Sequence, residues 1–302
     1  MKLKYLIAIF ALATSISANA NDGKSMSVIW PYSVSDPPAN YTRFAIDEMN
    51  KAQSQYNFIF ENKPGAGSAI AARHVEMNPQ NTVLSTSTAF FIRPNFFPND
   101  SHNVSNFVPL VPQCANPMLV ISKKYKTFDK NKQAAFTIGT SGLGDTTYLL
   151  ALQIKEQYPN AVIVPYKSTS DALIDVISGQ IDFSVGFVAA FEQYLDKGDL
   201  HGIGVSGKKT VKGISTLTSQ GIPYADEIVI TFFTAVNKDM SEATRKEMRE
   251  IVSTAAKSNT VQEAYRSQFC DPLDMTEKQT QDWFARQIYL WNKLTKTVKL
   301  DK

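Results

Sequence analysis

The chain has 302 residues, of which 43% are hydrophobic and 20% are charged. Its formal net charge of +3 falls to about +1 when the two lysines near the N-terminus are removed, which leaves no electrostatic footprint for nucleic acid. Composition and length are those of an ordinary globular protein with room for two domains.

The first 20 residues, MKLKYLIAIFALATSISANA, have the pattern of a secretory signal peptide. Lys2 and Lys4 give a basic start, an apolar run follows, and Ala18-Asn19-Ala20 forms a small-x-small cleavage site. The apolar run is shorter than the roughly 20 residues of a membrane span. We therefore expect a signal peptide over residues 1–20 and an exported, soluble mature chain, with a buried N-terminal helix as the weaker alternative.

Two cysteines, Cys114 and Cys270, could pair in an oxidising compartment. Two buried free thiols are an equal alternative, and the sequence does not choose between them. Two thiols alone cannot form the usual four-ligand zinc site, and the three histidines, His74, His102 and His201, show no metal-ligand spacing. We expect no metal and no cofactor.

Strand-like and helix-like segments alternate along the mature chain. Strands are predicted over residues 27–30, 56–61, 82–85, 107–111, 118–122, 135–139, 161–165, 181–185, 202–205 and 228–236, and helices over 41–52, 68–77, 147–158, 168–179, 189–197, 241–258 and 277–296. Candidate caps are Ser68, the segment Ser168-Thr169-Ser170, Asp239, Ser241 and Thr276. This alternation predicts an α/β fold with parallel sheets.

Three polar or glycine-containing loops follow predicted strands, at residues 65–67, 85–88 and 140–146. Ligands of open α/β sheets bind at such strand ends. The 140–146 loop supplies hydroxyls, two glycines and a helix N-terminus, whose amides and dipole favour an anion. A capped turn without a ligand is an equal alternative.

Catalytic signatures are incomplete. The glycine loops lack the Gly-Lys-Ser/Thr of a phosphate-binding loop. Residues 139–143, GTSGL, begin like a nucleophile elbow, but Leu143 stands where the last glycine belongs, and no histidine has a persuasive context. We expect no enzyme.

Four segments together resemble the Bug-type periplasmic receptors of tripartite tricarboxylate transport systems. They are ENKPGAGSAIAARHV (61–75), STSTAFFIRPNFF (85–97), IGTSGLGDTTYLLAL (138–152) and VPYKSTSDALIDVISGQIDF (164–183), and their order and spacing agree with that family. The last segment is the most specific match.

The resemblance implies a two-lobed periplasmic binding protein, type II-like, with a hinge and a central cleft that closes like a flytrap. We divide it into lobe 1 (21–120 plus 225–302) and lobe 2 (121–224). The implied function is capture of a small organic acid in the cleft by a monomeric receptor, for delivery to membrane permease subunits. A sensory binding protein, or a receptor for an amino acid or another polar ligand, is the alternative.

This sequence departs from the family pattern near the expected cleft. Ser35, Asp36 and Pro37 fall where the family has glycines, Asp145 replaces a common serine, and Gly186 stands near the place of an aspartate. Proline has no amide to donate, and a carboxylate near a bound carboxylate costs on the order of 1 to 4 kcal/mol. Either these acids point away from the cleft or the ligand differs.

We predict ligand contacts from the strand-end loops. The predicted residues are Tyr32, Ser33 and Ser35, then Ser85, Thr86, Ser87 and Thr88, then Thr140, Ser141, Gly142, Gly144, Asp145 and Thr146, and finally Lys167 and Asp182. The last two could pair with each other or hold the second lobe's face of the cleft, and a purely structural role for both is an equal alternative. Gly65 and Gly67 are expected to pack a loop at the cleft edge rather than to grip the ligand. Phe90 and Phe91 could form an apolar wall, although core packing is expected for at least one.

Overall fold

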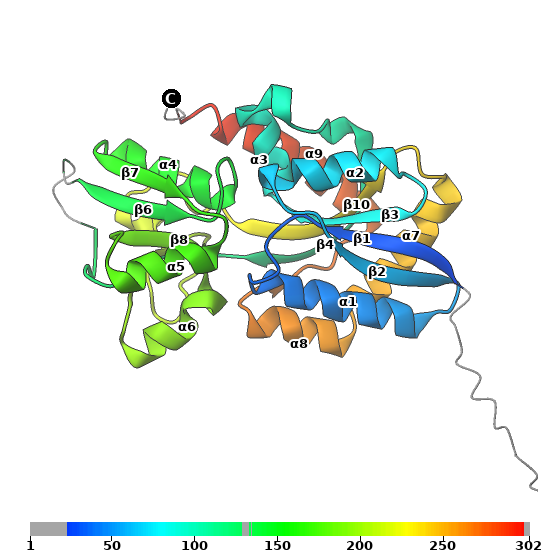
Figure 1. The fold of residues 1–302 in the computed structure, drawn as a ribbon, viewed down its shortest axis with the longest axis horizontal. Coiled ribbons are helices and arrows are strands. Elements are labelled where there is room, and N and C mark those ends of the chain that lie inside the picture. The colour runs from blue at the N-terminus through cyan, green and yellow to red at the C-terminus, as the bar shows by residue number, and fades with distance from the viewer. Residues whose placement is uncertain (1–22, 129–132, 134, 299–302) are drawn as a thin grey trace, which may run out of the picture.

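The structure, a computed structural model, describes residues 23–128, 133 and 135–298 (Figure 1). The segment predicted as a signal peptide, residues 1–20, lies outside these residues.

The first lobe is built on a six-stranded sheet in the order β11-β4-β10-β3-β1-β2. Its strands are β1 (Lys24–Trp30), β2 (Tyr56–Asn62), β3 (Thr82–Ser87), β4 (Phe107–Asn116), β10 (Ile230–Asn237) and β11 (Asp271–Pro272). Its helices are α1 (Pro38–Ala52), α2 (Ala69–Met77), α3 (Ala89–Phe96), α7 (Glu242–Ala256), α8 (Asn259–Ser267) and α9 (Glu277–Leu294). Short 3-10 turns cover Ala66–Ser68, Pro98–Asp100 and Val104–Asn106.

The second lobe is built on a five-stranded sheet in the order β7-β6-β8-β5-β9. Its strands are β5 (Met118–Ser122), β6 (Phe136–Thr140), β7 (Ala161–Pro165), β8 (Phe183–Phe187) and β9 (His201–Val205). Its helices are α4 (Thr146–Gln157), α5 (Thr169–Ser178) and α6 (Val188–Lys197), and a 3-10 turn covers Thr218–Gln220 on the way back to β10.

The chain crosses between the lobes at β4–β5 and again between β9 and β10 (Figure 1). These crossings make both sheets mixed. β1 pairs in parallel with β2 and β3, and β6 with β7 and β8, but β10 runs antiparallel to β3 and β4, and β5 runs antiparallel to β8 and β9. The expectation of parallel sheets is wrong for these strands, because each arrives directly from the other lobe without a crossover helix. Two α/β lobes joined by a hinge are confirmed, whereas our lobe boundaries stay a prediction.

The local signals were mostly correct. Ser168, Ser241 and Thr276 each cap a helix with their side chains. Ser68 precedes α2 but makes no side-chain cap bond, because its backbone is left-handed with φ +79°. We did not predict α3, because Phe90 and Phe91 near its start are typical of a strand and follow directly on β3.

Cys114 and Cys270 form a disulfide with a Cα–Cα distance of 5.4 Å, which settles the question that the sequence left open. The bond joins β4 to the segment just before β11, and both cysteines are fully buried. A segment near the C-terminus is thereby fixed to the strand that enters the hinge.

Candidate ligand-binding cleft

A cavity of about 520 Å³ lies between the lobes, at the ends of β1, β3 and β6. Both lobes supply its walls. The first lobe contributes Trp30, Pro31, Tyr32, Ser33, Val34, Asp36, Pro38, Asn62, Pro64, Gly65, Ala66, Gly67, Ser87, Ala89, Ile230 and Phe232, and the second Ser141, Gly142, Leu143, Asp145, Thr146, Thr147, Tyr166, Lys167 and Phe187.

The predicted site residues divide into two groups by position. Tyr32, Ser33, Ser87, Ser141, Gly142, Asp145, Thr146 and Lys167 line the cavity, whereas Ser35, Ser85, Thr86, Thr88, Thr140, Gly144 and Asp182 do not. Ser85 and Thr86 lie inside β3 and are buried. Contact of any of these residues with a ligand stays a prediction.

The Tyr32 hydroxyl organises the polar part of the first lobe's wall. It accepts hydrogen bonds from the Ser87 hydroxyl at 2.8 Å and from the Ser87 amide at 3.1 Å, and it shares a third with the Thr86 hydroxyl at 3.0 Å. Burial raises the pKa of Tyr32, so the phenol stays protonated. Tyr32 therefore holds the end of β3 against the β1–α1 loop.

In the second lobe, Asp145 is the centre of the β6–α4 loop. Its carboxylate accepts hydrogen bonds from the Ser141 hydroxyl and the Thr147 hydroxyl, both at 2.7 Å, and from the Tyr148 amide at 2.8 Å, which caps α4. Burial raises the pKa of Asp145, while these donors oppose the rise. Both carboxylate oxygens are committed to protein donors, so Asp145 shapes the cavity as a structural cap.

Asp36 has different surroundings in the β1–α1 loop. Its side chain is 7% exposed, lines the cavity, and leaves Oδ1 without a hydrogen-bond partner among the described residues. Burial, with the nearby carboxylates of Asp145 and Asp171, raises its pKa to about 7, while the amides of Ser170 and Thr169 at the start of α5 act in the opposite sense. Asp36 thus faces the second lobe across the cleft.

The loop at Gly65–Gly67 turns through left-handed backbone, with φ of +118° at Gly65, +48° at Ala66 and +52° at Gly67. A Cβ on Gly67 would lie 3.3 Å from two side-chain atoms of Arg93, so the loop packs closely on α3. All three loop residues also line the cavity. The glycines are therefore needed for close packing at the rim, and whether they touch the ligand stays untested.

Apolar residues that read as core from the sequence form much of the wall. Trp30 stacks on Phe232 with ring centroids 6.0 Å apart, and Phe187 stacks on the same ring at 6.3 Å. All three line the cavity, together with Ile230. Trp30 and Phe187 are the last residues of their strands, and this strand-end position is the one signal that could have identified them.

Two other candidates have structural surroundings. Phe90 and Phe91 are buried against each other and against Phe233, and neither lines the cavity. Asp182 accepts hydrogen bonds from the Thr137 amide and hydroxyl at 2.9 and 3.1 Å. No ion pair joins it to Lys167 within the described part of the chain.

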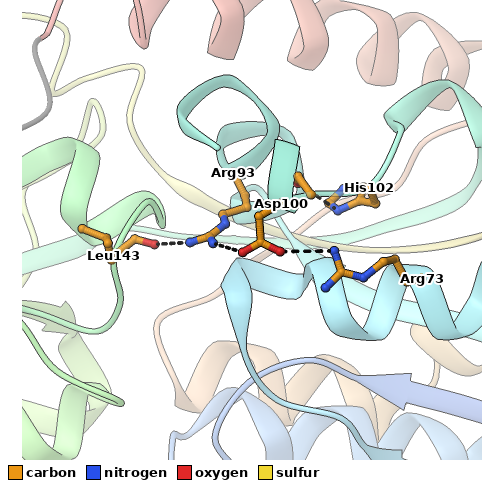
Figure 2. A network of polar contacts seen from close by, with 6 residues as sticks. Arg73, Arg93, Asp100, His102 and Leu143 are labelled. Atoms are coloured by element: carbon orange, nitrogen blue, oxygen red, sulfur yellow. Dashed lines mark hydrogen bonds and ion pairs between the residues drawn. The ribbon is translucent and has the colours of Figure 1, made fainter. Parts of the chain in front are cut away.

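Direct contacts hold the lobes together beside the cavity. Arg93 of α3 donates to the Leu143 carbonyl of the second lobe at 3.2 Å and pairs with Asp100 at 3.1 Å, as Figure 2 shows. The Thr88 and Thr146 hydroxyls share a hydrogen bond of 3.0 Å across the same gap. The cavity is therefore closed on this side by contacts between the lobes.

Chemically, the cavity combines an apolar wall with one anion-attracting side. Lys167 is the only cationic side chain among the described lining residues. Gly142 and Leu143 line the cavity, and their amides donate to no other group of the described residues. They lie in the loop just before the Asp145 N-cap of α4, where unpaired amides can donate to an anion.

None of the helices in the described part of the chain has the length and apolar character that a membrane span requires. Within the same residues, His, Cys, Asp and Glu side chains do not gather into a group that could hold a metal ion.

Solved structures share this fold. The periplasmic binding protein BugD superposes with a TM-score of 0.81 at 18% identity, covering 91% of this chain and 97% of that one. R. palustris Rpa4515 with adipate gives 0.81 at 17% identity, covering 91% and 97%. MatC from Rhodopseudomonas palustris with bound malate gives 0.79 at 17% identity, covering 90% and 99%.

Sequence comparison agrees with the fold. Protein BugT of Bordetella pertussis is 20% identical over 94% of this chain and 92% of its own length. The model of the tripartite tricarboxylate transporter family receptor matches residues 41–300. The chain therefore belongs to the tripartite tricarboxylate transporter receptor family.

Proposed function

We propose that this protein is a periplasmic receptor that captures a small organic carboxylate between its lobes and delivers it to the membrane subunits of a tripartite tricarboxylate-type transporter. One observation carries the proposal: a cavity walled by both lobes holds Lys167 and the unused amides of Gly142 and Leu143 in the loop that leads into α4. A carboxylate bound there would accept hydrogen bonds from the second lobe, and contacts of the rest of the ligand with the first lobe's wall would favour the closed form.

The relatives support this proposal. Two proteins of the same fold were solved with adipate and malate, which are carboxylates, and the family's name joins the receptor to a transporter. We extend the proposal to export by cleavage after residue 20, to action as a monomer, and to binding without chemical turnover. A sensory role uses the same cleft, and no feature of the site favours it.

Thermal unfolding of the mature chain tests the proposal with matched pairs, each a carboxylate and its neutral amide, such as succinate with succinamide and benzoate with benzamide. A ligand at 100 times its dissociation constant stabilises by about 2.7 kcal/mol, which raises Tm by several degrees. We expect at least one carboxylate to raise Tm and its amide to have no effect.

Two lysine variants make the test specific. Lys167→Met should abolish the shift, whereas Lys197→Met, which changes an exposed lysine of α6 outside the cavity, should keep it. A shift of equal size with the amides, or no shift with any carboxylate, would contradict the proposal.

A further inference from the structure

We infer that the ligand is a hydroxylated aromatic monocarboxylate rather than a small dicarboxylate, and that Asp36 is the residue that selects against a second carboxylate. This inference rests on the proposed function, because it assigns the chemical class of the ligand in the same cleft.

The charges in the cavity wall do not suit two carboxylates. The described lining residues include one cation, Lys167, and two acids, Asp36 and Asp145. Lys167 can balance one carboxylate of a ligand. A second carboxylate would have no cationic partner in the wall and would lie in the field of the two acids, where like charges at contact repel.

The helix N-termini around the cleft are largely occupied by the protein itself. At α1, Pro37 and Pro38 carry no amide hydrogen, and the Ala39 and Asn40 amides bind the carbonyls of Asp36 and Pro37. The α4 terminus is capped by the carboxylate of Asp145. One anion subsite therefore remains, at Gly142, Leu143 and Lys167.

The start of α5 is occupied in the same way. Ser168 caps this helix by accepting from the Asp171 amide at 3.1 Å, and the Asp171 carboxylate accepts from the Ser168 hydroxyl at 2.9 Å. The carboxylate of Asp36 faces the same helix end from the opposite lobe. A ligand anion would compete with these groups for the α5 terminus.

A separate observation on Asp36 also supports the inference. Its Oδ1 is buried and without a partner, and of the described lining residues it is the one with such an atom. A buried polar atom that lacks a partner costs free energy, and a ligand that supplies a donor removes that cost. A hydroxyl group is such a donor, whereas an ionised carboxylate offers only acceptors.

The apolar part of the cavity wall indicates which chemical group joins the polar ends of the ligand. Trp30, Phe232 and Phe187 form a stacked aromatic surface at the cavity. The volume of about 520 Å³ falls within the range of roughly 300–1,000 Å³ that encloses ligands of drug size. Aromatic rings pack favourably against such a surface. A planar ring between the carboxylate and the hydroxyl fits this arrangement better than a short flexible chain.

Isothermal titration calorimetry at pH 7.5 with ligands of one ring body tests the inference: benzoate, 3- and 4-hydroxybenzoate and terephthalate, with malate and adipate as flexible dicarboxylates. For the wild type we expect a hydroxybenzoate to bind at least about tenfold more tightly than terephthalate, malate or adipate, a factor that corresponds to roughly 1.4 kcal/mol. Benzoate should lie between them.

Variants of Asp36 place the selection on this residue. Asp36→Asn and Asp36→Ser should each strengthen terephthalate binding by about tenfold and change benzoate binding by less than about threefold. Asp171→Asn removes a neighbouring carboxylate that does not line the cavity and should keep the wild-type preference. The far-ultraviolet circular dichroism of each variant shows whether it is folded.

The outcomes separate the two proposals. Tighter binding of malate, adipate or terephthalate by the wild type, or an unchanged preference in both folded Asp36 variants, would overturn the inference and leave the carboxylate receptor intact. Failure of every monocarboxylate and dicarboxylate to bind the folded wild type would overturn the proposed function itself.

Discussion

Asp36 and Asp145 occupy corresponding places in the two lobes, each in the loop between a strand and the helix that follows it. Asp145 accepts three hydrogen bonds from its own loop and helix, through both oxygens. Asp36 is 7% exposed and leaves Oδ1 without a partner at the cavity wall. The same side chain is therefore a structural cap in one lobe and a candidate recognition group in the other.

The role of an acidic residue near a carboxylate site therefore depends on its hydrogen-bond partners, which decide whether it is structural or faces the ligand. The donors around Asp145 compensate its burial and turn it inward to its own helix. Burial of Asp36 is compensated only in part, by the amides of Ser170 and Thr169 on the facing lobe. Substitutions at the two positions should consequently have opposite effects on stability.

The largest expected effect is the pH dependence due to Asp36. Its pKa of about 7 in the folded state lies above the unfolded value of 3.8, so the folded state binds the proton more tightly. Stability from this group is complete below pH 4 and is lost as pH rises through 7, by roughly 4 kcal/mol at most. Urea unfolding of wild type and Asp36→Asn at pH 5 and pH 8 measures the stability that each protein loses between the two pH values. This loss should be larger for the wild type.

One result would contradict this prediction of pH dependence. Equal losses of stability between pH 5 and pH 8 in the two proteins would mean that Asp36 ionises as freely in the folded state as in the unfolded one. The partners that decide the outcome are Asp145, Asp171 and the α5 amides.

Removal of Asp145 should have the next largest effect on stability. It should destabilise the protein, whereas removal of the Asp36 carboxylate should not. Asp145→Ala deletes the α4 cap and leaves the hydroxyls of Ser141 and Thr147 without their acceptor. Loss of an N-cap costs about 0.5–2 kcal/mol, and we expect the upper part of that range here. Thermal unfolding measures it, with Asp36→Ala as the matched control, which should be neutral or stabilising at pH 8. Equal destabilisation by both would remove the contrast.

An effect of comparable size is expected where the β6–α4 loop meets the first lobe. Gly144 has φ +77°, and a Cβ there would lie 2.8 Å from the Phe97 ring. Gly144→Ala should cost more than the roughly 1–2 kcal/mol of a left-handed alanine, and it should weaken ligand binding by hindering closure. Gly179→Ala is the matched control, since its φ is +81° and nothing lies within 4 Å. Equal losses of Tm would mean that the Phe97 contact is soft.

Much of this arrangement could be predicted from the sequence. Strand and helix alternation indicates the α/β lobes, and the three strand-end loops do converge on one cavity. The resemblance to the family also indicates that Asp36 and Asp145 depart from its usual pattern. It cannot show their partners, because the donors to Asp145 depend on the loop's turn, and Asp36 meets α5 only when the two lobes come together.

The aromatic wall could not be predicted for a different reason. Trp30, Phe187 and Phe232 are almost completely buried, so their apolar character is that of any core residue. Only a position at the end of a strand, next to the other lobe, distinguishes an aromatic residue of the cavity wall from one of the core. The mixed sheets escaped prediction similarly, because the strand direction of β5 and β10 depends on which lobe the chain comes from.

The most direct test of the account is a titration of the Asp36 carboxyl carbon by NMR, assigned by comparison with Asp36→Asn, in the free protein and with saturating benzoate. We expect a midpoint near pH 7 in the free protein and a higher midpoint with benzoate, because a nearby anion disfavours the ionised carboxylate. A midpoint near the ordinary value of an aspartate that does not respond to benzoate would contradict the placement of Asp36 beside the ligand.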